Sequence, residues 1–178
     1  IEPGTFNDDS AIYRELKEVI AKKNITNILA KKGMQIDLGG GVFLDILFPD
    51  RDVSTWTTND GSIVARLSYG ETSVMLTGDT TAETEKIILS ENAKEALDSD
   101  ILKVAHHGSK TSSSKAFVEA VSPEYALISD GKNNTYGHPH QQTLDTLSSL
   151  GIEVWRTDIL GTIIMKSDGQ NVTFKTRR

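Results

Sequence analysis

The stretch "ILKVAHHGSKTSSSKAFVEAVSPEYALIS", residues Ile101–Ser129, decides the fold class of this chain. It opens with an apolar run over residues 101–105, which is expected to form a strand. It then passes through a loop rich in Gly, Ser and Lys and continues with a helical pattern over residues 114–121. It ends in a second apolar run over residues 125–129. A strand, loop, helix and strand in this order form the repeating unit of an α/β protein.

The same unit occurs on both sides of this stretch. Upstream, an apolar run ends at Thr77-Gly78-Asp79, and Thr80 with Glu83 has the spacing of a capping box that begins a helix over residues 81–91. Downstream, the loop "DGKNNTYGHP" precedes a helix over 141–150, a terminating Gly151 and a strand over 152–156. The second half of the chain is therefore expected to alternate strands and helices.

The first half of the chain and its C-terminal end have the pattern of hairpins. A helix capped by Ser10 comes first, and its apolar face, Ile12, Leu16, Val19 and Ile20, is expected to lie on a sheet. The β-rich runs lie over 27–30, 34–38, 42–48, 62–68, 72–77, 162–166 and 172–175. We expect one domain over residues 1–178.

Composition limits the possible functions. Of the 178 residues, 37% are hydrophobic and 25% are charged, and no apolar run approaches the ~20 residues of a membrane span, as expected for a soluble domain. The net charge of −6 argues against a broad basic surface for nucleic acid, although a local basic groove remains compatible with it. Because the chain has no cysteine, a metal site would depend on histidine and carboxylate.

Three loops that follow strands carry the residues most suited to chemistry. They hold Asp79, the pair His106 and His107, and His138 with His140. Ligand sites of α/β proteins lie at the carboxyl ends of strands. Imidazole and carboxylate are the ligands of hydrolytic Zn or Mn centres.

Each residue also has a purely structural interpretation. An aspartate between a strand and a helix is usually a turn or cap residue, and His138 and His140 can be solvated loop residues. The histidine pair is harder to explain in this way, but adjacent residues on extended backbone face opposite sides, so one ring should point away from a site. Ser109, Lys110, Ser112 and Ser113 can form a small anion site at a helix start, or simply a soluble loop.

The ordered motifs "TGD", "LKVAHHGS", "SDGKNNTYGHP" and "RTDILGTI" resemble the metallo-β-lactamase-like domain of ComEC-type DNA-uptake proteins and their stand-alone relatives, from about residue 30 onward. The resemblance implies an αββα sandwich of the α/β class and a centre of one or two Zn or Mn ions. It implies hydrolysis of a phosphodiester or related ester.

The resemblance also implies roles for individual residues. Asp79, His106 and His107 match metal-ligand positions, although the resemblance does not decide which of the two histidines binds the metal. His138 matches a catalytic histidine beside the site. Given a complete domain, Ser109, Lys110, Ser112 and Asn134 would contact substrate.

One departure from the family pattern is informative. The family carries an upstream HxHxDH motif that supplies most metal ligands, and no histidine precedes His106. We therefore expect a C-terminal portion of such a domain that alone is inactive and binds metal weakly or not at all, since catalytic zinc needs about three protein ligands. An exposed sheet edge should favour a homodimer.

Two functional classes follow from the sequence. The first is part of a phosphodiesterase or nuclease that acts on DNA beside a membrane channel, in a membrane-associated or extracytoplasmic parent protein. The second is a non-catalytic scaffold or binding module of the same fold. A hydrolase of a small ester or phosphodiester unrelated to DNA is a further alternative, which the acidic balance slightly favours over a nuclease.

Overall fold

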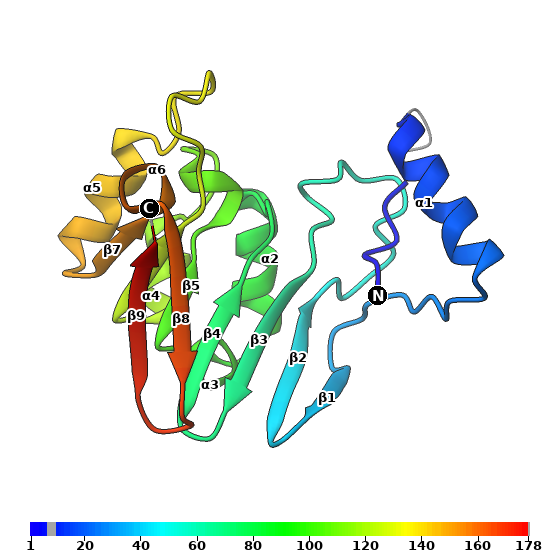
Figure 1. Cartoon of the computed structure of the whole chain (residues 1–178), viewed down its shortest axis with the longest axis horizontal. Helices are drawn as coiled ribbons and strands as arrows, with labels where there is room; N and C mark the ends of the chain where they lie inside the picture. Colours follow the sequence, from blue (N-terminus) through cyan, green and yellow to red (C-terminus); the bar gives the residue numbers. More distant parts are fainter. Residues whose placement is uncertain (7–9, 178) are drawn as a thin grey trace.

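The computed structural model describes residues 1–6 and 10–177 and has a mixed α/β fold (Figure 1). Most expected elements are present. The helices are α1 (Ala11–Lys22), α2 (Ala82–Glu91), α3 (Lys94–Leu97), α4 (Lys115–Val121), α5 (Gln141–Ser149) and α6 (Thr157–Leu160), with one 3-10 turn, η1 (Ala105–Gly108). The strands are β1 (Gln35–Gly39), β2 (Val42–Phe48), β3 (Val64–Tyr69), β4 (Thr72–Leu76), β5 (Ile101–Lys103), β6 (Tyr125–Ile128), β7 (Glu153–Arg156), β8 (Thr162–Ser167) and β9 (Val172–Arg177).

Seven of these strands form one sheet in the order β1-β2-β3-β4-β5-β6-β7. The first four pair antiparallel through two-residue or longer turns, and β4 to β7 pair parallel. Parallel neighbours need a crossover connection, which contains α2, α4 and α5 in turn. Since right-handed crossovers that all step in one direction lie on the same face, the three helices cover a single face of the sheet.

The main core lies between this helical face and the sheet. Met75, Leu102 and Ile128 point from the strands toward Ile88 and Phe117 of the helices, and all five side chains are buried. The buried residues around them include Leu47, Phe48, Val64, Leu97, Val104, Val118, Val121, Ala126 and Leu147. Their burial is the principal stabilising contribution to this half of the molecule.

The two-stranded sheet β8-β9 lies against the opposite face and crosses in front of the larger sheet in Figure 1. Phe174 packs on Tyr125 and Trp155 with ring-centroid distances of 4.9 Å each. In the turn between β3 and β4, the N–H of Glu71 donates to the carbonyl oxygen of Gly169, in the turn between β8 and β9, over 2.6 Å. The expected α/β class is confirmed, and the described residues supply a helical layer and two stacked sheets.

Helix α1 departs from the expectation that it lies on a sheet. It forms over the expected residues, capped by the Ser10 hydroxyl, but it lies beyond β1 and β2, apart from the helical layer (Figure 1). Its apolar face faces solvent, with Ile12 80% and Leu16 52% exposed. Amphipathic periodicity identifies an apolar face but not its partner, and of the four residues of this face only Ile20 is half-buried. None of the described helices combines the length and apolar character that a bilayer crossing requires.

Three local expectations were also wrong. The run 27–30 forms only an isolated bridge between Glu2 and Leu29. The capping box is not formed, because Thr81 is the N-cap of α2 and its hydroxyl donates to Asp60 instead. The strand expected over 101–105 ends at Lys103, where the chain turns into η1.

Glu85 is a buried carboxylate that the sequence pattern did not distinguish. It is 0% exposed, and its two oxygens accept the backbone N–H groups of Ser113 at 2.5 Å and Ser114 at 2.8 Å. These bonds join α2 to the start of α4 and hold the end of the histidine loop. Burial raises the pKa of the Glu85 carboxyl, although both hydrogen bonds favour the ionised form.

The exposed face of α1 predicts self-association. Leu16→Glu places a charge in this face, and we expect it to weaken a dimer at least about tenfold, since burying one leucine contributes about 1.5–3 kcal/mol. Static light scattering over a concentration series measures this. Glu18→Gln, on the opposite side of α1, should associate like the wild type. A wild-type protein that stays monomeric at high concentration would contradict the prediction.

Glu85→Gln should destabilise the fold at acidic pH by about 1–3 kcal/mol, because the amide NH2 group cannot accept from a backbone N–H, whereas both oxygens of a protonated carboxyl can. The folded state holds the Glu85 proton more tightly than the unfolded chain does. The contribution of Glu85 to the free energy of unfolding therefore falls as pH rises through its raised pKa. The difference in free energy of unfolding between the variant and the wild type, measured by urea titration, should therefore narrow with rising pH. The exposed Glu83→Gln should stay within about 0.5 kcal/mol of the wild type at each pH. A difference that widens with pH would refute this account.

Candidate functional site

The carboxyl ends of the parallel strands bring the expected residues to one edge of the sheet. The loop after β4 carries Asp79, the loop after β5 carries His106 and His107, and the loop after β6 carries His138 and His140. Parallel pairing of β4 with β5 and of β5 with β6 points these loops in the same direction.

The backbone of the histidine pair is left-handed. His106 has φ 48° and ψ 46°, and His107 has φ 55° and ψ 25°. The expectation that one ring points away was wrong, because it assumed extended backbone. Left-handed conformations cost roughly 1–2 kcal/mol per non-glycine residue and concentrate at functional sites. Here they turn both rings toward His138.

The four histidines of the chain form one cluster. The ring centroid of His138 lies 5.6 Å from that of His106, 6.4 Å from that of His107 and 4.8 Å from that of His140. Partial burial lowers the pKa of His138, and the nearby His140 and His106 rings lower it further, so its neutral form is favoured near pH 7. The cluster therefore places four imidazole rings within reach of one another at this edge.

Gly108 allows the two histidine loops to approach. It has φ +81°, and a Cβ added there would lie 2.5 Å from Cβ of Pro139. The carbonyl oxygen of Gly108 accepts the N–H of His140 at 2.9 Å. A glycine is therefore needed both for the backbone conformation and for the contact.

The Gly78 carbonyl oxygen joins the aspartate loop to the histidine loop. It accepts the backbone N–H of His106 at 3.2 Å and Nζ of Lys103 at 2.9 Å. Burial lowers the pKa of Lys103, and the carboxylate of Asp79 opposes this shift. Lys103 was not expected at the site. Its only signal in the sequence is a charge at the end of an otherwise apolar strand.

A hydrogen bond sets the proton position on the His107 ring. Nδ1 of His107 lies 2.5 Å from the Ser129 carbonyl oxygen. A carbonyl only accepts, so the neutral ring carries its proton on Nδ1 and has a free lone pair on Nε2. This arrangement is typical of histidines that bind a metal through the other nitrogen. Nδ1 of His106 is buried and has no hydrogen-bond partner.

The donor types at this edge fit Zn or Mn, but their arrangement does not complete a site. Among the described residues, no group of three or more His, Cys, Asp or Glu side chains is placed to hold a metal ion. The metal-binding roles of Asp79, His106 and His107 stay predictions.

The remaining expected residues surround the cluster. Ser109 and Ser112 are buried in the loop, where the Ser109 hydroxyl lies 3.0 Å from that of Thr111 and the Ser112 hydroxyl has no partner, whereas Lys110 is exposed. The Asn134 amide nitrogen donates to Asp130 and to the His138 carbonyl oxygen. Its position makes Asn134 a residue that shapes the loop, and the substrate-binding roles of all four expected residues stay predictions.

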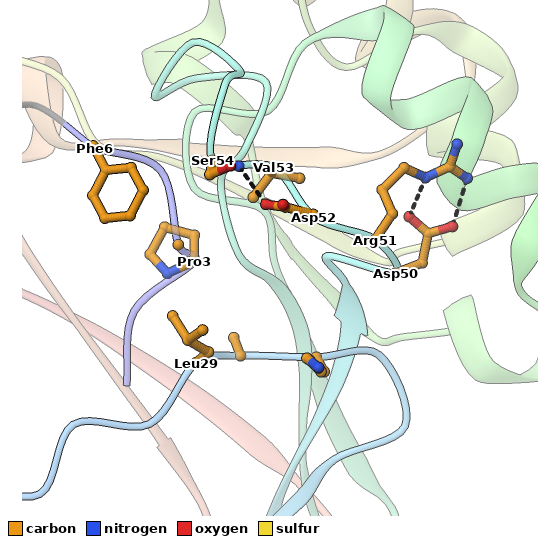
Figure 2. A pocket seen from close by; sticks show the side chains of 11 residues that line it. Pro3, Phe6, Leu29, Asp50, Arg51, Asp52, Val53 and Ser54 are labelled. Carbon is orange, nitrogen blue, oxygen red and sulfur yellow. Dashed lines mark hydrogen bonds and ion pairs between the residues drawn. The ribbon is translucent and has the colours of Figure 1, made fainter.

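A separate hollow of about 580 Å³ lies between the N-terminal segment and the residues after β2 (Figure 2). Its carboxylates have partners: Nε and Nη2 of Arg51 donate to Asp50, and Asp52 accepts the backbone N–H of Ser54 at 2.9 Å. None of the four histidines lines this hollow. The reactive side chains therefore gather at the sheet edge, away from it.

Gly108→Ala should separate the two histidine loops. We expect a loss of about 2–4 kcal/mol in the free energy of unfolding, from the left-handed backbone and the overlap with Pro139. Chemical denaturation measures the loss. Gly131→Ala, where an added Cβ meets nothing within 4 Å, is the matched control in the neighbouring loop. Equal stability of the two variants would show that the loops are not in close contact.

Comparison with known proteins relates this chain to one protein superfamily. Residues 33–130 match the model of the metallo-beta-lactamase superfamily. The chain is 41% identical over 116 residues to ComE operon protein 3 of Bacillus subtilis, covering 65% of this chain and 15% of that protein. It is 38% identical over 105 residues to competence protein ComA of Neisseria gonorrhoeae, covering 59% of this chain and 15% of that protein.

Recombination protein 2 of Haemophilus influenzae is 36% identical over 123 residues, covering 69% of this chain and 15% of that protein. These three relatives are competence proteins of the ComEC type, and the chain spans about 15% of the length of each. Because the family model spans more than half of the chain and includes β1 to β6, this chain belongs to the metallo-β-lactamase superfamily.

Proposed function

We propose that this chain is part of a metal-dependent hydrolase domain that cleaves a phosphodiester, with DNA as the substrate in a protein of DNA uptake. Membership of the metallo-β-lactamase superfamily and the competence proteins among its relatives support this proposal. A membrane-associated parent protein with an extracytoplasmic domain is part of the same proposal.

The observation that carries the proposal is the histidine cluster at the carboxyl edge of the parallel strands. Two adjacent left-handed histidines turn both rings toward His138, which lies 5.6 Å from His106 between ring centroids. Such strained backbone is retained where the surrounding structure supports it and the function needs it. Neutral imidazoles with free lone pairs suit metal binding and proton transfer.

The roles follow from the surroundings of each ring. His107, oriented through Nδ1 by the Ser129 carbonyl, presents Nε2 as a ligand to a metal, with Asp79 and His106 as further ligands. A bound Zn or Mn ion would supply the lowered pKa of a water molecule. His138, whose lowered pKa favours the neutral ring, is suited to donate an N–H hydrogen bond to negative charge that develops on the substrate.

A non-catalytic binding module of the same fold is the second candidate. The incomplete donor set among the described residues favours it for the isolated chain. A hydrolase of a small ester or phosphodiester is compatible with the net charge of −6, because such substrates need little phosphate neutralisation.

Hydrolysis assays on the full-length protein test the proposal. With Mn²⁺ we expect cleavage of single-stranded DNA, and of bis(4-nitrophenyl) phosphate if the site accepts small diesters. EDTA should abolish both reactions. His107→Ala should lower the rate by about 10²-fold or more, the range expected for loss of a metal ligand or proton-transfer group.

One control variant and two contrary outcomes complete the test. Glu18→Gln, far from the sheet edge, should keep the wild-type rate. A His107→Ala variant with full activity would move the ligand role to His106. Absence of any cleavage by the full-length protein with Mn²⁺ or Zn²⁺ would favour the binding module.

A further inference from the structure

We infer that Tyr136 is a stacking platform for a nucleobase of single-stranded DNA or RNA, beside the histidine cluster. This inference rests on the proposed function for the class of substrate and names the group that the site would recognise. The Tyr136 side chain is 78% exposed, which is unusual for an aromatic residue in a loop whose backbone is closely held.

The Tyr136 ring is the outer member of a series of nearly parallel rings. It is stacked on His138 with a centroid distance of 5.9 Å and an interplanar angle of 21°. His138 in turn is stacked on His107 with a centroid distance of 6.4 Å and an angle of 18°. Since one face of Tyr136 lies against His138 and most of the ring is exposed, the other face is available to a planar partner.

Asn134 holds the backbone on both sides of Gly137 in position. Its side-chain oxygen Oδ1 accepts the backbone N–H groups of Tyr136 at 3.1 Å and His138 at 3.0 Å. Its amide nitrogen donates to the carboxylate of Asp130 at 3.0 Å and to the His138 carbonyl oxygen at 2.7 Å. A platform that is ordered before binding costs little entropy when a ligand arrives.

The hollow beside the ring suits a base better than a phosphate. It has a volume of about 300 Å³, at the small end of ligand sites, and Tyr136, His107, His138 and Asp130 are among the residues that line it. The carboxylate of Asp130 would repel a phosphate, and the chain has a net charge of −6. Base stacking on an aromatic ring requires no positive charge and tolerates any base.

Binding measurements in EDTA test this inference apart from hydrolysis. The probes are a 5′-labelled single-stranded oligothymidylate and an abasic oligonucleotide with the same number of phosphates, and the readout is fluorescence anisotropy. The wild-type chain should bind the oligothymidylate more tightly. Tyr136→Ala should weaken that binding by about 5- to 100-fold and leave abasic binding unchanged.

Variants at the same position separate stacking from other effects. Tyr136→Phe and Tyr136→Trp keep a ring and should retain the preference for base-containing DNA. Phe6→Ala removes an exposed aromatic ring from the separate hollow of Figure 2 and should bind both probes like the wild type. Circular dichroism should show equal folding of all variants, because the Tyr136 side chain is exposed.

Three outcomes would overturn the inference: equal wild-type affinity for the two probes, unchanged binding by Tyr136→Ala, or loss of the preference in both ring-retaining variants. The proposed hydrolase fails by a different result, namely no cleavage of any phosphodiester by the full-length protein with metal. A chain that stacks bases in EDTA while the full-length protein cleaves nothing would be a binding module with the same Tyr136 platform.

Discussion

The parallel pairing of β4, β5, β6 and β7 in sequential order is the constraint on which the rest of the structure depends. Each crossover steps in the same direction, so its helix lies on the same face and its loop lies at the same edge. This arrangement buries one face of the sheet in a single core. It also brings Asp79 and His140, which are about 60 residues apart, to one end of the strands.

The backbone conformation of the loop after β5 then sets the directions of the histidine side chains. The left-handed histidine pair and Gly108 form a turn that extended or helical residues would not make. Its cost is offset by the contacts around it: Glu85 holds the end of the loop, the Gly78 carbonyl holds the start, and Pro139 packs against Gly108. A cluster of four imidazole rings results, and the exposed ring of Tyr136 lies at its outer side.

The side chains at this edge are suited to bind a metal ion, but too few of the described ones converge to hold one. His107 has the oriented ring of a metal ligand, and His138 has a lowered pKa. Among the described residues these groups do not form a metal site by themselves. The two proposals, a hydrolase domain and a module that binds a planar ligand, both use the groups at this edge.

Sequence patterns by themselves determined the order of strands and helices and the loops that carry Asp79, His106 and His138, because local periodicity and turn residues report on local structure. The short helices α3 and α6 were missed, since four residues carry too little periodicity. Only the tertiary structure decided that both histidines of the pair face His138, that Lys103 and Glu85 hold the loops, and that α1 leaves its apolar face exposed. Each of these depends on contacts between residues distant in the chain, and neither periodicity nor spacing contains that information.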